Sequence, residues 1–181
     1  RTSAVHLLAL VSDVLDMSKV DANVLDVDAV PVDVTAIARS TVEELRPLAV
    51  RAEITMEVVS AGPIVALADP ARFRQVLHNL LTNALRFAPG GHVHIGVRRE
   101  GDMAAVDVVD DGCGMDEKTR LRCLLPFEKG ERSVGGTGLG LAIGHRLCRL
   151  MGGDLTVESA PDQGSTFTVT LPLAPDATTP R

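Results

Sequence analysis

The segment from residue 92 to residue 110 restricts the possible folds of this chain more than any other part. Two strand-like runs, HVHIGVRRE and MAAVDVVD, flank a Gly101-Asp102 turn. This pattern predicts a β-hairpin, in which the two strands pair antiparallel. A second hairpin is predicted over 154–172, where a Pro-Asp-Gln-Gly turn separates DLTVES from STFTVTLP.

Helices are predicted on both sides of the first hairpin. Apolar residues recur at helical spacing in the segments 33–51, 70–87 and 139–151. Asp69 and Pro70 are typical of a helix N-terminus, and ITMEVV (54–59) reads as one more strand. Because helices and hairpins are mixed along the chain, we predict an α+β fold. The predicted architecture is a two-layer α/β sandwich with one mixed sheet and helices on one face, preceded by one long helix.

The composition supports a packed core and argues against a nucleic-acid partner. Of the 181 residues, 45% are apolar and only 2% are aromatic, so Val, Leu, Ile and Ala must fill the core. The net charge of −6 disfavours nucleic acid, whose phosphates need a basic surface. The three cysteines show no C-x-x-C spacing, which argues against a disulfide framework or structural zinc and favours a cytoplasmic location.

The first residues predict a helix with a wide apolar side. Within residues 3–20, the 4-3-4 spacing of a coiled-coil seam is followed by Ala4, Leu8, Val11 and Leu15. This helix either packs on its own domain or belongs to a bundle whose other helix is missing, and its wide apolar side favours the bundle. Because the chain begins with Arg1 and not Met, we expect it to be a piece of a longer protein. No apolar run is long enough to span a bilayer, so we expect no membrane contact by this piece. Whether its parent protein has a membrane anchor is left open by the sequence.

The helix predicted over 70–87 carries a polar stripe beside its apolar side. Asn79, Asn83 and Arg86 lie at positions i, i+4 and i+7, within roughly 60° of one another around the helix. Carboxamide oxygens suit Mg²⁺, and a guanidinium suits phosphate oxygens through paired hydrogen bonds. A solvated polar face explains the same residues, and for this helix alone we prefer that explanation.

The run DDGCG (110–114) places an acidic residue at the end of a predicted strand. Gly112 and Gly114 allow the backbone to approach a flat ligand closely. The Asp110 carboxylate is able to accept a hydrogen bond from an amino group such as that of adenine. A plain Asp-Gly turn is the simpler explanation, and for this run alone it is preferred.

The glycine-rich run at 135–140 leads directly into the apolar helix 139–151. Free N–H groups and the helix dipole make such a helix start an anion site. The run is not a P-loop, because no Gly-Lys-Ser/Thr follows, and it does not match G-x-G-x-x-G after a strand. A structural glycine hinge is the alternative. The segment 111–137 as a whole lacks periodicity, and a loop of that length is usually functional or mobile.

Taken in order, these motifs resemble those of the sensor histidine kinases of two-component systems. NLLTNA (79–84), DDGCG (110–114) and GTGLGL (136–141) resemble the N, G1 and G2 boxes of that family. Pro126-Phe127 resembles its F box, although Leu124 stands where a further Phe is common.

The resemblance extends over nearly the whole chain. Gly164-Ser-Thr-Phe167 resembles the closing strand motif, and Met151-Gly-Gly153 is also typical of the family. Residues 6–23 resemble the second helix of the dimerisation hairpin. The resemblance implies the Bergerat-type ATP-binding sandwich of the GHKL superfamily. It divides the chain into part of the hairpin's second helix (1–22), a linker (23–32), the catalytic ATP-binding domain (33–174) and a disordered tail (175–181).

The resemblance also implies which residues contact ATP and Mg²⁺. Asp110 would accept from the adenine amino group, Asn83 and then Asn79 would hold Mg²⁺, and Arg86 and His78 would meet phosphates. Residues 116–136 would form a mobile lid over ATP. The remaining ATP-binding residues implied are Gly112, Gly114 and Met115 around the adenine with Thr166 nearby, Lys129 or Arg132 as lid cations, and Gly136, Thr137, Gly138, Leu139 and Gly140 at the phosphates.

The family reaction transfers the γ-phosphoryl group of ATP to a histidine, from which a response-regulator receiver domain takes it onto an aspartate. Members keep that histidine in a His-Glu/Asp-x-x-x-Pro motif on the first helix of a homodimeric hairpin. None of the five histidines here has that context; they are His6, His78, His92, His94 and His145. We therefore expect a chain that binds ATP without phosphorylating itself.

Two other interpretations remain open from the sequence. In the first, the chain is a non-catalytic module whose ATP site only sets conformation, although the complete set of motifs argues against a decayed site. In the second, it is a serine kinase of the same superfamily. Those kinases usually carry an acid four residues before the magnesium Asn, where this chain has Asn79, and they lack a dimerisation hairpin.

Overall fold

The computed structural model describes residues 26–128 and 137–175. The predicted helix 3–20, the predicted lid cations Lys129 and Arg132, and Gly136 lie outside the described residues. The strands are β1 (Val30–Asp33), β2 (Thr55–Ser60), β3 (Val65–Ala68), β4 (His92–Glu100), β5 (Met103–Asp110), β6 (Asp154–Ser159) and β7 (Ser165–Pro172). The helices are α2 (Val34–Arg51), α3 (Pro70–Phe87), α4 (Glu117–Arg122) and α5 (Gly140–Leu150).

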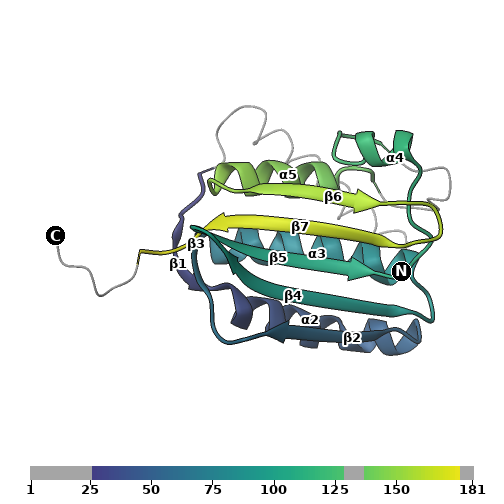
Figure 1. Cartoon of the computed structure of the whole chain (residues 1–181), viewed down its shortest axis with the longest axis horizontal. Helices are drawn as coiled ribbons and strands as arrows, with labels where there is room; N and C mark the ends of the chain where they lie inside the picture. Colours follow the sequence, from purple (N-terminus) through teal and green to yellow (C-terminus); the bar gives the residue numbers. More distant parts are fainter. Residues whose placement is uncertain (1–25, 129–136, 176–181) are drawn as a thin grey trace, which may run out of the picture.

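The described chain forms a sheet backed by helices on one face, as Figure 1 shows. The five-stranded sheet has the order β2-β4-β5-β7-β6, and a two-stranded sheet pairs β1 with β3. β2 runs parallel to β4, whereas the β4–β5, β5–β7 and β6–β7 pairs are antiparallel. Helices α2, α3 and α5 lie behind the larger sheet in Figure 1. The predicted two-layer α+β sandwich with a mixed sheet is therefore confirmed.

The core between the layers is built from aliphatic side chains. On α3, Phe73, Leu77 and Leu81 are almost fully buried, and they face the helix side of the central strands. Val106 and Val108 of β5 contribute fully buried side chains to the same cluster. Removing this apolar surface from water supplies the main driving force for closing helices onto sheet.

Local signals fix where α3 begins and ends. The Asp69 carboxylate accepts from the backbone N–H of Ala71 at 2.9 Å and of Arg72 at 3.1 Å, which caps the helix as predicted. Pro70 occupies the first turn, and the helix ends at Phe87 before the Pro89-Gly90 turn. The sequence prediction did not include β3 or the short helix α4.

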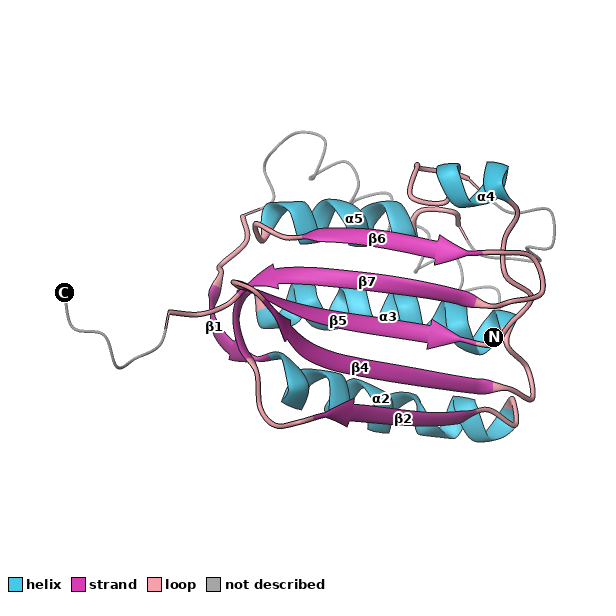
Figure 2. Cartoon of the chain, viewed as in Figure 1, coloured by secondary structure: helices cyan, strands magenta, loops and turns pink. Residues whose placement is uncertain are grey.

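The end of β5, the last turn of α3, helix α4 and the first turn of α5 all lie toward the right of Figure 2. This end of the molecule therefore gathers the three motifs that the sequence singled out. Among the described residues, no helix is both long enough and apolar enough to cross a membrane.

Candidate functional site

The polar stripe of α3 faces the start of α5. The Asn79 side-chain N–H donates to the carbonyl oxygen of Gly140 at 3.1 Å. The Asn83 side chain is half-buried, and it makes no hydrogen bond to any residue that the structure describes. Arg86 follows in the last turn and is exposed. A half-buried carboxamide with no hydrogen bond to a described residue fits the predicted role of Asn83 as a ligand for a hard cation.

Asp110 is the buried acid of the site. It ends β5, is only 6% exposed, and its carboxylate accepts from the backbone N–H of Gly112 at 3.0 Å. Burial raises the pKa of the Asp110 carboxyl, although backbone hydrogen bonds from Gly112 and Ser165 act against that rise. The charge of Asp111 raises the pKa further. A buried carboxyl of this kind is typical of a functional position and not of a plain surface turn.

Close backbone packing explains the two glycines after Asp110. A Cβ at Gly112 would overlap the carbonyl oxygen of Phe87, the last residue of α3. A Cβ at Gly114 would overlap the carbonyl oxygen of Ala160, and Gly114 has a φ of +60°. The loop therefore lies directly against the end of α3, and Met115 continues it with its N–H bonded to the Ser159 hydroxyl at 2.9 Å.

The first residue of β7 lies beside Asp110, and the sequence prediction did not name it. In the β5–β7 ladder, Asp110 pairs with Ser165, whereas Thr166 pairs with Val109. Neighbouring residues of a strand point to opposite faces, so Ser165 lies on the face of Asp110 and Thr166 on the other. The structure therefore does not bring Thr166 to the side of Asp110. Strand periodicity alone separates two such neighbours, but only the register shows which one belongs to the site.

The described part of the glycine run forms a tight entry to α5. The Thr137 hydroxyl accepts from the N–H of Leu139 at 3.0 Å, and Gly138 has a φ of +74°. The Gly138 carbonyl accepts from the N–H of Phe127 at 2.9 Å, which ties the run to the predicted F box. The Phe127 side chain itself is 69% exposed. The first turn of α5 provides N–H groups and a positive dipole end for an anion.

These contacts bring the three motifs to one place. Gly140 lies beside the Asn79 side chain, and the N–H of Cys113 donates to the carbonyl of Phe87 at 3.3 Å. α3 is thus the common neighbour of the DDGCG loop and of the glycine run. Two carboxamides, a buried acid and a helix start are the groups that a magnesium nucleotide needs, so the residues present fit both ATP and Mg²⁺.

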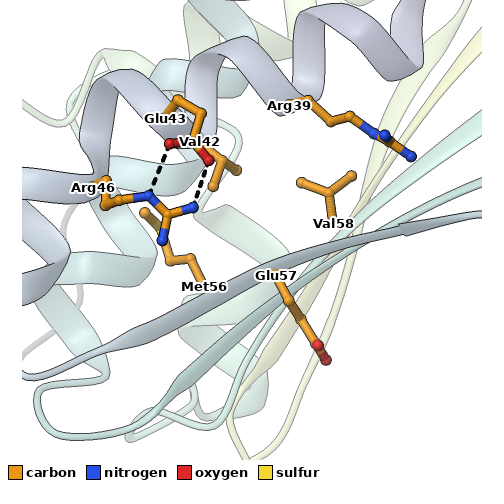
Figure 3. Close-up of a pocket in the computed structure, with 7 residues that line it drawn as sticks. All are labelled: Arg39, Val42, Glu43, Arg46, Met56, Glu57 and Val58. Carbon is orange, nitrogen blue, oxygen red and sulfur yellow. Dashed lines mark hydrogen bonds and ion pairs between the residues drawn. The ribbon is translucent and has the colours of Figure 1, made fainter.

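A separate groove lies between α2 and the edge strand β2, as Figure 3 shows. Its volume is about 590 Å³, and it is lined by Arg39, Val42, Glu43, Arg46, Met56, Glu57 and Val58. Arg46 pairs with Glu43 across one helical turn. None of the residues predicted to contact ATP lines this groove.

The chain is similar to known proteins over most of its length. Residues 68–175 match the family of histidine kinase-, DNA gyrase B- and HSP90-like ATPases. The chain is 39% identical over 178 residues to the circadian input-output histidine kinase CikA of Synechococcus elongatus, covering 94% of this chain and 24% of that protein. It is 36% identical over 179 residues to the sensor protein TorS of Escherichia coli, covering 94% of this chain and 19% of that protein. The chain thus spans a quarter or less of these relatives.

A solved structure shows the same fold. The crystal structure of full-length ShkA in complex with AMPPNP matches with a TM-score of 0.87 and 33% sequence identity, covering 98% of this chain and 38% of that chain. The family match covers more than half of the present chain, and the buried acid, carboxamide stripe and glycine-rich helix start lie within the matched residues. The chain therefore belongs to the family of histidine kinase-, DNA gyrase B- and HSP90-like ATPases, as an ATP-binding catalytic region of the sensor histidine kinase type.

Proposed function

We propose that this chain binds ATP with Mg²⁺ and presents the γ-phosphoryl group to a histidine that lies outside these residues. The observation that carries the proposal is that the loop after Asp110 and the start of α5 both lie against α3, the helix that carries Asn79 and Asn83. We assign three further functions to the longer parent protein: transfer to the histidine, relay to a response-regulator receiver domain, and homodimerisation through a hairpin. We propose that the region described by this chain is cytoplasmic.

The residues divide the work of binding between the two ends of the nucleotide. Asp110 accepts from the adenine amino group, and Gly112 and Gly114 let the loop after it pack directly against the backbone of Phe87 and Ala160. Asn83 and Asn79 hold Mg²⁺, whose charge offsets that of the phosphates. Arg86 and the N–H groups at the start of α5 orient the phosphates, with Lys129, Arg132 and Gly136 predicted to complete the enclosure.

Four of the five histidines lie within the described residues, and none of them stands in the acceptor motif of the family. His92, His94 and His145 contact the carboxylates of Asp111, Glu57 and Asp154, at 3.2, 3.1 and 3.1 Å. His78 is half-buried on α3 next to Asn79, and from there it meets the phosphates of the nucleotide. Phosphoryl transfer requires an imidazole in line with the γ-phosphate. Because none of the five histidines of this chain has the acceptor motif, we place that imidazole on another segment of the parent protein.

The test combines a binding measurement with a labelling measurement. We expect calorimetry to show ADP binding that Mg²⁺ strengthens, and we expect γ-labelled ATP to leave no acid-labile label on this chain alone. The full-length parent should acquire such label. Stable label on this chain alone would contradict an external acceptor, whereas a parent that binds ATP and never becomes labelled would favour the non-catalytic sensing module.

A further inference from the structure

Asp111, next to the buried Asp110, makes contacts that a freely solvated surface acid lacks. Its carboxylate accepts from the backbone N–H of His92 at 2.8 Å and contacts the His92 ring nitrogen Nδ1 at 3.2 Å. In return, the Asp111 backbone N–H donates to the His92 carbonyl at 3.3 Å. The last ladder pair of the β4–β5 hairpin, Val93 with Asp110, lies directly beside these bonds. The Asp111 side chain therefore closes the hairpin at the point where the chain turns toward Gly112.

The Asp111 carboxylate packs closely against the turn at Gly91 and His92. A Cβ at Gly91 would overlap the Asp111 carboxylate oxygen, so only glycine lets the acid lie this close. The same turn is held on its other side, because the Gly91 carbonyl accepts from the N–H of Thr55 at 3.1 Å, and the N–H of Gly90 donates to Ala52 at 2.9 Å. The carboxylate thus joins the end of β5 to a turn that is already fixed.

This turn follows α3 directly, and α3 carries the carboxamides of the site. Ala88 caps α3 and accepts from the N–H of Gly91 at 3.0 Å, while Phe87 supports Gly112 and Cys113. The end of β5 is therefore connected to the end of α3 in more than one way. Gly112 packs on Phe87, and the Cys113 N–H donates to the Phe87 carbonyl. The Asp111 side chain adds a further connection through the turn at Gly91 and His92.

We infer that Asp111 is a positioning residue that sets the adenine-binding carboxyl of Asp110 against the magnesium-binding face of α3, acting through the turn at Gly91-His92. The inference rests on the proposed function, because it needs a nucleotide between these two groups. It assigns a role in the site to a residue that touches neither adenine nor metal.

The charge of Asp111 gives the inference a readout that mere structural support would lack. Burial is the largest cause that raises the pKa of Asp110, and the Asp111 charge adds to it against the N–H groups of Gly112 and Ser165. The backbone N–H of His92 is the largest cause that lowers the pKa of Asp111, which keeps Asp111 charged while Asp110 titrates. Two titratable side chains lie near Asp110: Asp111, the next residue in the chain, and His92 of β4, which contacts Asp111. Ser165 of β7, which pairs with Asp110, is uncharged.

The experiment measures the affinity of the whole chain for ADP with Mg²⁺ across the acidic and neutral pH range. Asp111→Asn keeps an acceptor for the His92 N–H and removes the charge, so the acidic midpoint of binding should move to lower pH with little change near neutrality. Asp111→Ala removes the acceptor as well, and affinity should fall roughly tenfold at every pH, the equivalent of one lost hydrogen bond to a charged group.

Matched controls lie on the same two strands. Asp102→Ala changes an exposed acid in the turn at the opposite end of the hairpin, and His94→Ala removes the other histidine–carboxylate contact of β4. Both should bind ADP as the unsubstituted chain does. Thermal unfolding of every variant distinguishes a chain that has lost its fold from a folded chain in which Asp110 is misplaced relative to α3.

The outcomes are distinct. The Asp111→Ala and Asp111→Asn variants could unfold at lower temperature and still bind ADP with unchanged affinity and an unchanged pH midpoint. That result would overturn the positioning role and leave the proposed function intact. An unsubstituted, folded chain that binds no adenine nucleotide would overturn the proposed function and this inference together. Weakened binding by Asp111→Ala with a shifted midpoint for Asp111→Asn supports the inference.

Discussion

The Asn79 side chain donates a hydrogen bond to the Gly140 carbonyl at 3.1 Å and so joins α3 to the first residue of α5. The two residues are 61 positions apart in the chain. The bond uses the amide N–H and leaves the Asn79 side-chain oxygen for a cation. Asn83, one turn further along α3, makes no such bond within the described part of the chain.

This difference separates the two carboxamides experimentally. Asn83→Ala should leave the unfolding temperature unchanged and weaken ADP binding roughly tenfold in Mg²⁺ only, because it removes a cation ligand and no hydrogen bond to a described residue. Asn79→Ala should in addition lower the free energy of unfolding by about 0.5–1.5 kcal/mol, since the Gly140 carbonyl loses its donor. Calorimetry with and without Mg²⁺ and thermal melts measure both effects. An Asn83→Ala chain with the same Mg²⁺ dependence as the parent would remove Asn83 from the metal site.

Asp110 should contribute to binding at the expense of stability. Asp110→Asn should weaken ADP binding by about 1–3 kcal/mol, because the adenine amino group then meets a partly mismatched amide. The pKa of Asp110 is raised in the folded chain, mainly by burial, so the folded state holds its proton more tightly than the unfolded state. Stability is therefore lost as pH rises from the ordinary aspartate pKa through the raised one. At neutral pH, nucleotide-free Asp110→Asn should melt at a higher temperature, and an equal or lower melting temperature would contradict this account.

Gly114 should tolerate no side chain. Gly114→Ala places a Cβ against the Ala160 carbonyl in a backbone with a φ of +60°, so it should lower the free energy of unfolding by more than about 1 kcal/mol. Gly62→Ala is the matched control, because a Cβ at Gly62 meets nothing within 4 Å. Denaturant unfolding of both variants measures the difference. Equal stabilities would show that the loop between β5 and α4 relaxes without cost.

The three cysteines should differ in their reaction with a thiol reagent. Burial raises the pKa of Cys123 to about 11 and that of Cys148 to about 12, so both remain protonated thiols at mildly alkaline pH. Cys113 is less buried and lies between Gly112 and Gly114. We expect alkylation of the folded chain to modify Cys113 first, and Mg²⁺-ADP to slow that reaction. Mass spectrometry of the labelled peptides identifies the site, and faster labelling of Cys148 would contradict the buried core.

Local sequence signals predicted most elements of the fold because they act within a few residues. Asp69 and Pro70 specify the start of α3 through bonds to neighbouring N–H groups, and the Gly101-Asp102 turn specifies the β4–β5 hairpin. The predicted strands and helices of the core agree with the structure to within a residue or two. β3 was missed because its four residues are stabilised by pairing with the distant β1 and carry no turn signal of their own.

The sequence by itself determined the fold class and pointed to the chemical groups of the proposed site: an acid at a strand end, carboxamides one helical turn apart, and glycines before a helix. Only the tertiary structure decided how they meet. The β5–β7 register puts Ser165 and not Thr166 on the face of Asp110, and the β4–β5 register puts His92 against Asp111. Strand register and helix docking depend on contacts between segments far apart in the chain, and periodicity within one segment carries no information about its distant partner.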